Sequence, residues 1–355
     1  MKGRKTYVLL TAILIFCTIG TDFLWAQSED LFDKSKLLHI TISGELLGLM
    51  NDRTGKAEYY PVTLSYLSED SAKISIPLRS RTRGNFRRMK DNCTYPPLFL
   101  NFSKKNDNGI FSSQDKIKLV MPCRGDAYVL REYHVYKLYN LISPKSFRAR
   151  LVKVTLEDSS LRPRERGPFY GFLLEEEERM AERNHMVPIK QQLIRPEQTV
   201  RQDFLKMAVF EYLIGNTDWS VQYRQNVKLI TPDTLGLIYT VPYDFDHAGI
   251  VRAPYAKPAV ELKLSSIRER RYRGYCIESM EYYEEVIAYY NSLKDSLYAV
   301  YTESELLDAG YIKSTVKYID SFYKTLNNPR ALKREFQYPC NAAGTGNVVI
   351  KGLRD

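Results

Sequence analysis

The apolar residues of this chain change their period along its length, and this change limits the folds that it can adopt. Before Glu178 apolar residues alternate with polar ones in short β-branched runs, the pattern of half-buried strands. After Asp203 they recur at helical spacing, with Leu205, Ala208 and Val209 on one face of a predicted helix. The chain is therefore expected to combine a β-rich first part with a mainly helical second part.

Both parts can be divided into elements from these periods. One helix, predicted over 131–142, interrupts the strands of the first part, and Pro144 follows it as a stop. In the second part Gly215 is a good helix end. The predicted strands cover 37–47, 59–66, 72–78, 97–102, 116–121, 150–156 and 169–174, and the predicted helices of the second part cover 204–214, 279–295 and 303–326.

Residues 1–26 have the features of a secretory signal peptide. A basic start precedes an apolar core, 7–19, which is short for a membrane span, and Ala26 ends a plausible cleavage site. The product is expected to be secreted, periplasmic or associated with the cell envelope, without a stable membrane span. The predicted domains are the signal peptide 1–26, a β-rich N-lobe 27–178, a helical C-lobe 179–340 and a loose tail 341–355.

The chain is basic, with a formal net charge of +10 that falls to +8 if residues 1–26 are removed. Much of this charge lies in two runs, one of five arginines between Arg79 and Arg88 and one at 268–273. Such runs are usually solvated faces. No nucleic-acid motif or aromatic-interleaved groove accompanies them, so no nucleic-acid partner is expected.

Four cysteines lie beyond residue 26, namely Cys93, Cys123, Cys276 and Cys340. An even number in an exported chain favours disulfides, and three pairings are possible. Cys93 with Cys123 is the favoured pair, because both lie in loop-like stretches that flank the same strands. No cysteine pair has the CxxC spacing of a zinc site.

The stretch from Gly215 to Asp246, GNTDWSVQYRQNVKLITPDTLGLIYTVPYDFD, places polar groups at the ends of predicted elements. Asp218 follows the predicted helix 204–214, Asn226 opens a predicted hairpin, and Asp244 and Asp246 end its second arm. A carboxylate, an amide and a carboxylate pair in this order are the parts of a phosphoryl-transfer site. One carboxylate takes or orients the acceptor proton, and the others hold the metal that bridges the phosphates.

Five elements in order, spanning roughly 80–290, resemble the CotH-kinase family, the secreted relatives of a spore-coat kinase. The resemblance implies an α+β, two-lobed protein-kinase-like fold, with a β-rich N-terminal lobe and a mainly helical C-terminal lobe, that binds ATP and Mg²⁺ or Mn²⁺ and phosphorylates an unknown protein or glycan acceptor. The elements are Arg83-Gly84-Asn85, the strand Tyr170-Gly171-Phe172-Leu173-Leu174 before the glutamate run 175–178, Gly215-Asn216-Thr217-Asp218-Trp219, Asn226-Val227-Lys228-Leu229 and Pro242-Tyr243-Asp244-Phe245-Asp246.

Position then predicts a role for each residue. Asp218 is the predicted catalytic residue, and Asn226, Asp244 and Asp246 are the predicted metal ligands. Lys118, on the strand before the first helix, is predicted to bind phosphate and to pair with Glu132, although Lys116 or Glu165 could serve instead. Arg83 is a further candidate phosphate contact. The glutamates of 175–178 would border the adenine, or form a solvated connector.

Two other functions remain open from the sequence. Asn226 stands eight residues after Asp218, where a kinase loop has five, and the strand at 96–99 has no lysine. Both departures would suit a catalytically inactive kinase-like binding module of the cell envelope. The Asp244-Phe245-Asp246 motif also resembles the metal-binding motif of a glycosyltransferase, although the first part lacks alternating strand and helix units.

Overall fold

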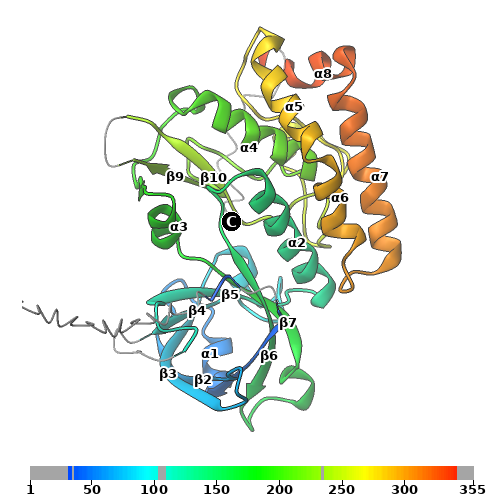
Figure 1. Cartoon of the computed structure of the whole chain (residues 1–355). Coiled ribbons are helices and arrows are strands. Elements are labelled where there is room, and N and C mark those ends of the chain that lie inside the picture. Colours follow the sequence, from blue (N-terminus) through cyan, green and yellow to red (C-terminus); the bar gives the residue numbers. More distant parts are fainter. Residues whose placement is uncertain (1–30, 34–35, 103–108, 233–235, 342–355) are drawn as a thin grey trace, which may run out of the picture.

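The structure is a computed structural model that describes residues 31–33, 36–102, 109–232 and 236–341. The predicted signal peptide, 1–26, and all of the predicted tail after Asn341 lie outside these ranges. Figure 1 shows a strand-rich part below and a helical part above. Within the described ranges, no helix combines the length and apolar character needed to cross a membrane.

Seven strands form a closed barrel in the first part of the chain. Their order around the barrel is β1-β2-β3-β4-β5-β7-β6, and each pair is antiparallel except β1 with β6, which is parallel and closes the ring. The strands are β1 (Leu38–Gly44), β2 (Tyr60–Leu67), β3 (Lys73–Thr82), β4 (Leu98–Phe102), β5 (Lys116–Val120), β6 (Ala149–Glu157) and β7 (Phe169–Leu174).

The alternation seen in the sequence fills the barrel. Ile40 and Ile42 of β1, for example, are buried in one apolar cluster with Leu64 and Ile117 of other strands. A short helix, α1 (Leu46–Asn51), adds its own apolar residues to that cluster. The segment 46–47 was predicted as the end of the first strand, but Gly44, with a φ of 143°, ends β1 before it.

The predicted two-lobed protein-kinase-like fold is wrong, because the strands of the first part close into a barrel. Closure depends on the parallel pairing of β1 with β6, for example Ile40 opposite Val154. Alternating residues identify each strand in the sequence, but they do not specify which distant strand pairs with the first one. The barrel also gives no support to a glycosyltransferase, which would need alternating strand and helix units.

The helical part packs against the outside of the barrel. The helix α2 (Asp126–Ile142) contacts β6 and β7 on one side and helices of the second part on the other. The predicted helix 204–214 is confirmed as α4 (Arg201–Ile214), and Gly215 ends it with a left-handed φ of 68°. The remaining helices are α3 (Glu177–Arg183), α5 (Glu284–Ser292), α6 (Lys294–Thr302), α7 (Ala309–Leu326) and α8 (Pro329–Phe336).

A small antiparallel sheet carries the predicted hairpin. Its strands are β8 (Val187–Pro188), β9 (Val227–Thr231) and β10 (Tyr239–Pro242), in the order β10-β9-β8. Leu229 and Val241 of this sheet are buried in the same apolar core as α2 and α4. The ends of β9 and β10 are thereby fixed next to the end of α4, where the candidate site lies.

Two disulfides connect the four cysteines that the structure describes. The predicted Cys93–Cys123 pair is confirmed, with Cα atoms 4.3 Å apart, and Cys276–Cys340 is the second, with Cα atoms 4.6 Å apart. Both distances are within the range that a disulfide can span. The first ties the loop after β3 to the segment between β5 and α2, and the second ties the segment before α5 to the end of the described chain.

Candidate active site

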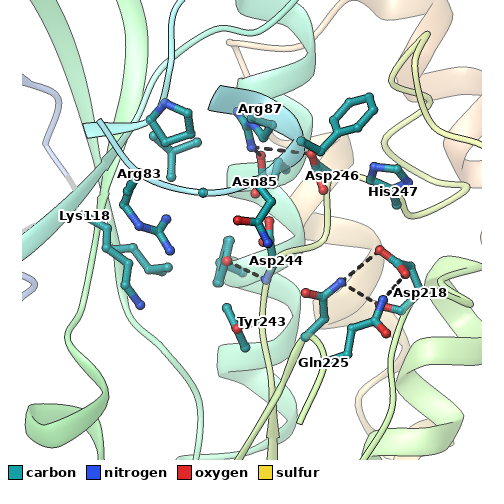
Figure 2. Close-up of a pocket in the computed structure, with 18 of the residues that line it drawn as sticks. Arg83, Asn85, Arg87, Lys118, Asp218, Gln225, Tyr243, Asp244, Asp246 and His247 are labelled. Carbon is teal, nitrogen blue, oxygen red and sulfur yellow. Dashed lines mark hydrogen bonds and ion pairs between the residues drawn. The ribbon is translucent and has the colours of Figure 1, made fainter. Parts of the chain in front are cut away.

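A pocket of about 460 Å³ lies between the barrel and the helical part. Figure 2 shows Arg83 and Lys118 on one side of it and Asp218 on the other, with Asp244 between them. The structure therefore brings the predicted site residues together, while their chemical roles stay predictions. The seven predicted residues that line the pocket are Arg83, Lys118, Glu132, Asp218, Asn226, Asp244 and Asp246.

Asp218 lies in a tight turn after α4 that hydrogen bonds hold on every side. Its backbone N–H donates to Oδ1 of Asn216 at 3.0 Å. The buried guanidinium of Arg273 donates to the carbonyl oxygens on either side, those of Thr217 at 2.5 Å and Trp219 at 2.6 Å. These bonds fix the backbone that carries the Asp218 carboxylate.

The eight-residue spacing between Asp218 and Asn226 is closed by a small hairpin. Ser220 and Gln225 exchange both backbone hydrogen bonds at 2.9 Å, so the chain returns to its starting point. The Asn226 amide then donates to the Asp218 carboxylate at 3.1 Å and to its carbonyl oxygen at 2.6 Å. The side-chain amide of Gln225 donates to the second carboxylate oxygen of Asp218. The additional residues of this loop therefore do not separate the two site residues.

Asp244 and Asp246 follow β10 on either side of a buried aromatic ring. Asp244 has a left-handed φ of 64°, and its N–H donates to the Tyr136 hydroxyl of α2 at 2.9 Å. Phe245 is fully buried and packs on Tyr136 with ring centroids 4.8 Å apart. Asp246 is buried and accepts a hydrogen bond from the Tyr255 hydroxyl at 3.0 Å. Packing of the central Phe245 thus anchors both carboxylates at the pocket.

The predicted pairing of Lys118 with Glu132 is not made. Glu132 is buried and binds Arg87 instead, with Nη1 and Oε2 2.9 Å apart, and the same Nη1 lies 3.7 Å from Asp246. Arg87 also donates to the carbonyl oxygen of Met121 at 3.0 Å. Arg87 lies in a short turn after β3, from which its side chain contacts both Glu132 and the Met121 carbonyl oxygen.

Lys118 and Arg83 form a cationic wall on the barrel side. The Lys118 ammonium lies 5.6 Å from the ring centroid of Tyr243 and 5.8 Å from that of Phe147. Burial, together with the neighbouring Arg83, lowers the pKa of Lys118 to about 8. Neither cation forms an ion pair with a carboxylate of the described residues, so both are available to an anion in the pocket.

The opposite wall carries an excess of negative charge. Burial raises the pKa of Asp218, and the nearby Asp246 carboxylate acts in the same direction. Burial also raises the pKa of Asp244, again reinforced by Asp246. Glu132 is affected in the same way, with Arg87 opposing the shift. These shifts arise because several carboxylates share one partly desolvated region, which a bound cation would stabilise.

Oxygen donors for a divalent metal are available on this wall. Among the described residues, no hydrogen bond or ion pair reaches the Asp244 carboxylate. The Asn226 nitrogen is used by Asp218, which leaves its amide oxygen for another partner. Carboxylate and amide oxygens suit Mg²⁺ or Mn²⁺. Within the described ranges no three His, Cys, Asp or Glu side chains cluster as a metal site, so the Asn226 oxygen and oxygens of a ligand would have to complete the set.

Three residues that shape the site were not predicted from the sequence. Arg87 belongs to a basic run that looked solvated, although it is buried, and Arg273 belongs to the second such run. Gln225 lies in the loop between Asp218 and Asn226, whose length departs from the kinase spacing. In the glutamate run the prediction of a solvated connector fails for two residues, since the buried Glu175 binds Arg148 and Arg183 and the buried Glu177 binds Arg224 and Lys228, whereas Glu178 is exposed. No periodicity distinguishes such buried charges from exposed ones.

Comparison with models of protein families finds no match to this chain, and comparison with curated proteins finds no significant one. The resemblance to the CotH-kinase family is therefore carried by its short motifs alone. The function of the pocket has to be argued from its own chemistry.

Proposed function

We propose that this chain is an exported phosphotransferase that binds ATP with a divalent metal and phosphorylates a hydroxyl group of a protein or glycan. The observation that carries this proposal is the separation of charge across one pocket. Arg83 and Lys118 form the cationic wall, and Asp218, Asp244 and Asp246 form the acidic wall on the opposite side. A metal-bound triphosphate needs both, cations for its phosphate oxygens and carboxylates for its metal.

The cationic wall would hold the phosphates. With a pKa of about 8, Lys118 is mostly protonated at neutral pH and can donate to phosphate oxygens. The guanidinium of Arg83 lies beside it and can donate through several N–H groups at once. Asp244, Asp246 and Asn226 would hold the divalent metal, which neutralises phosphate charge when bound.

Asp218 would act on the acceptor. The acceptor oxygen forms a bond to the terminal phosphorus of ATP while the bond from that phosphorus to the bridging oxygen breaks, and ADP leaves with the electron pair. The acceptor proton passes to the Asp218 carboxylate. Gln225, Asn226 and Arg273 hold this carboxylate and its turn in place, so it is oriented before the acceptor binds.

Export rests on the cysteines and on the predicted signal peptide. Two disulfides are typical of proteins that fold in oxidising compartments. We therefore place the proposed activity outside the cytoplasm, either in the secreted fraction or at the cell envelope.

One observation favours a second function, a binding module that holds the nucleotide without transferring phosphate. Both carboxylate oxygens of Asp218 already accept an amide hydrogen bond, from Gln225 and from Asn226. Each oxygen keeps a second acceptor site, so a role as base stays available. The two functions differ in phosphate transfer and not in nucleotide binding.

Calorimetry with ATP and magnesium, beside a radiolabel transfer assay with serine peptides, separates these functions. We expect Asp244→Ala and Asp246→Ala each to weaken magnesium-dependent ATP binding by about tenfold or more, because a lost charged contact costs about 1.5–3 kcal/mol. Asp218→Ala should keep the affinity and reduce transfer by about 10²–10⁴-fold. Asp91→Ala, an exposed residue outside the pocket, is the control.

The wild-type protein decides the outcome. If it binds no ATP with magnesium, the proposal fails. If it binds ATP but neither turns it over nor labels any peptide, the binding module replaces the phosphotransferase.

A further inference from the structure

Three arginines follow one another along a single face of β3. Side chains of a strand alternate between its two faces, so Arg79 and Arg81 point to the same side, and both are exposed, whereas Ser80 and Thr82 between them are buried. Arg83 continues the series, because its backbone N–H still donates to the Pro97 carbonyl oxygen beside β4 at 2.9 Å. The three arginines therefore repeat at every second residue, which places their backbone positions about 6.6–6.8 Å apart along the strand.

Aromatic rings hold the two exposed guanidinium groups against the barrel. The guanidinium carbon of Arg79 lies 5.2 Å from the ring centroid of Tyr59, and that of Arg81 lies 4.9 Å from the same ring and 5.7 Å from that of Phe99. Stacking of this kind restricts the side chains before any ligand binds, which lowers the entropic cost of binding.

This arginine row runs into the candidate active site. Arg81 is paired across the sheet with Phe99, and Phe99 is paired with Lys118, so the outer face of the barrel leads from the exposed arginines to the pocket. Arg83, at the end of the row, lines that pocket beside Lys118. A ligand on the row would thus have one end at the proposed site of phosphate transfer.

The row has no internal counter-charge among the residues that the structure describes. Arg79, Arg81 and Arg83 form no ion pair and donate no side-chain hydrogen bond to a protein group there, whereas the neighbouring Arg87 is paired with Glu132. Three adjacent cations repel one another, and an anionic ligand that spans them would remove this repulsion. The strand accounts for their common face, but the exposed Arg79 and Arg81 contribute no charge pairing to the fold.

We propose that the arginine row, Arg79 with Arg81 and Arg83, binds an extended acidic peptide segment of the acceptor protein. An extended peptide also presents every second side chain to one side, with a backbone repeat of about 6.6–6.8 Å, so carboxylates at alternate positions have the same repeat as the three arginines. The charge-assisted bonds would direct a neighbouring hydroxyl into the pocket. This inference rests on the proposed phosphotransferase function and chooses an acidic protein, instead of a glycan, as its acceptor.

The aromatic rings argue for a peptide over a single-stranded nucleic acid. Binding of single strands depends on bases that stack on open aromatic side chains. Here Tyr59 and Phe99 already carry arginine guanidinium groups on their rings. An anion recognised here is thus expected to bind through its charges alone.

Fluorescence anisotropy with a labelled synthetic peptide tests the docking step without catalysis. The peptide carries a serine and three glutamates at alternate positions, and a second peptide has the same composition with the glutamates adjacent. We expect the alternate peptide to bind about threefold more tightly. All three of its glutamates can face the strand, whereas in the second peptide only the first and third of the three consecutive glutamates can do so. Equal affinity for the two peptides would overturn the proposed register.

The double variant Arg79→Gln/Arg81→Gln should bind the alternate peptide about tenfold more weakly than wild type, because two charge pairs are lost. Its matched control is Arg330→Gln/Lys333→Gln, which removes two exposed cations from α8, on the far side of the molecule from β3. Equal affinities of the two double variants would overturn the inference. So would a single-stranded oligonucleotide that binds more tightly than the peptide and loses affinity in the same variant.

A transfer assay with the same serine peptides separates this inference from the function on which it rests. If phosphate transfer occurs and the Arg79→Gln/Arg81→Gln variant raises the KM for the alternate peptide about tenfold without changing kcat, both stand. If transfer occurs but its KM is the same in variant and wild type, the inference fails and the function stands. If the peptide binds through the arginine row but is never phosphorylated, the function fails.

Discussion

The two walls of the pocket are built in opposite ways. The cationic wall stands on regular strands, where Lys118 belongs to β5 and Arg83 directly follows β3. The acidic wall stands on loops, and two of its residues, Asn226 with a φ of 50° and Asp244 with a φ of 64°, adopt left-handed backbone. Such a conformation costs energy in residues other than glycine, so it persists only where neighbouring groups enforce it.

The difference shows where each wall gets its precision. The alternation of strand side chains places the cations without further help. The acidic wall instead depends on buried polar contacts, namely Arg273 on the carbonyl groups around Asp218, Tyr136 on the Asp244 N–H and Arg87 near Asp246. Removing one of these buried contacts should therefore disturb the acidic wall more than removing Arg83 or Lys118 disturbs the cationic wall.

The largest effect is expected from Arg87→Met. This change leaves Glu132 and Asp246 buried without their cation, and breaking a buried ion pair lowers the free energy of unfolding by about 3–5 kcal/mol. Chemical denaturation followed by circular dichroism measures it. Arg83→Met, which removes a pocket arginine without a buried partner, is the control and should stay within about 0.5 kcal/mol of wild type. Equal losses in the two variants would contradict the asymmetry.

Removing a disulfide should lower the free energy of unfolding somewhat less than Arg87→Met does. Replacing Cys93 and Cys123 by serine should lower the free energy of unfolding by about 3 kcal/mol, and replacing Cys276 and Cys340 should have a similar effect. Only the first pair anchors the turn that carries Arg87, so only its loss should also weaken ATP binding. Calorimetry on both double variants, at a temperature where each is folded, checks this. A weaker affinity in both would indicate that the disulfides act through global stability alone.

These contrasts also explain what the sequence could and could not predict. Strand alternation, the helix before Gly215 and the Cys93–Cys123 pair were predictable, because each depends on local pattern or on composition. The closed barrel was not, since the β1–β6 pairing joins segments more than a hundred residues apart and leaves no local mark. Its absence from the prediction led to the wrong fold class.

The same limit applies within the site. The short motifs pointed to Asp218 and Asp244, because each of these residues follows an element that local pattern predicts, a helix for Asp218 and a hairpin for Asp244. They could not identify Arg87 as the partner of Glu132, since nothing in a run of arginines shows which one turns inward. The eight-residue step to Asn226 likewise looked like a disruption until the Ser220–Gln225 hairpin accounted for it.

Loss of the Arg273 hydrogen bonds beside Asp218 should reduce phosphate transfer more than ATP binding. Arg273→Met removes the donor to the Thr217 and Trp219 carbonyl groups and should lower kcat by about 10–100-fold through misplacement of the carboxylate, with little change in ATP affinity. Arg273→Lys should recover part of the rate. The control is Arg270→Met, because Arg270 also donates to a backbone carbonyl, that of Leu213, but not next to Asp218. Equal losses of kcat in the two methionine variants would show that general stability is responsible.

The smallest effect concerns the cationic wall and is a dependence of ATP affinity on pH. Lys118 binds phosphate only when protonated, and its pKa in the free protein is about 8. A phosphate beside it would raise that pKa, so ATP affinity should be highest below the free value and fall as the pH rises through it. We expect a loss of about tenfold between about pH 7 and about pH 9, measured by calorimetry at constant ionic strength. Lys118→Met should bind more weakly at neutral pH and show a nearly flat profile. Lys116→Met, on the same strand but exposed, should keep the wild-type slope. If the slope persists in Lys118→Met, the titrating group belongs to the acidic wall, and the cationic wall does not contact the phosphates.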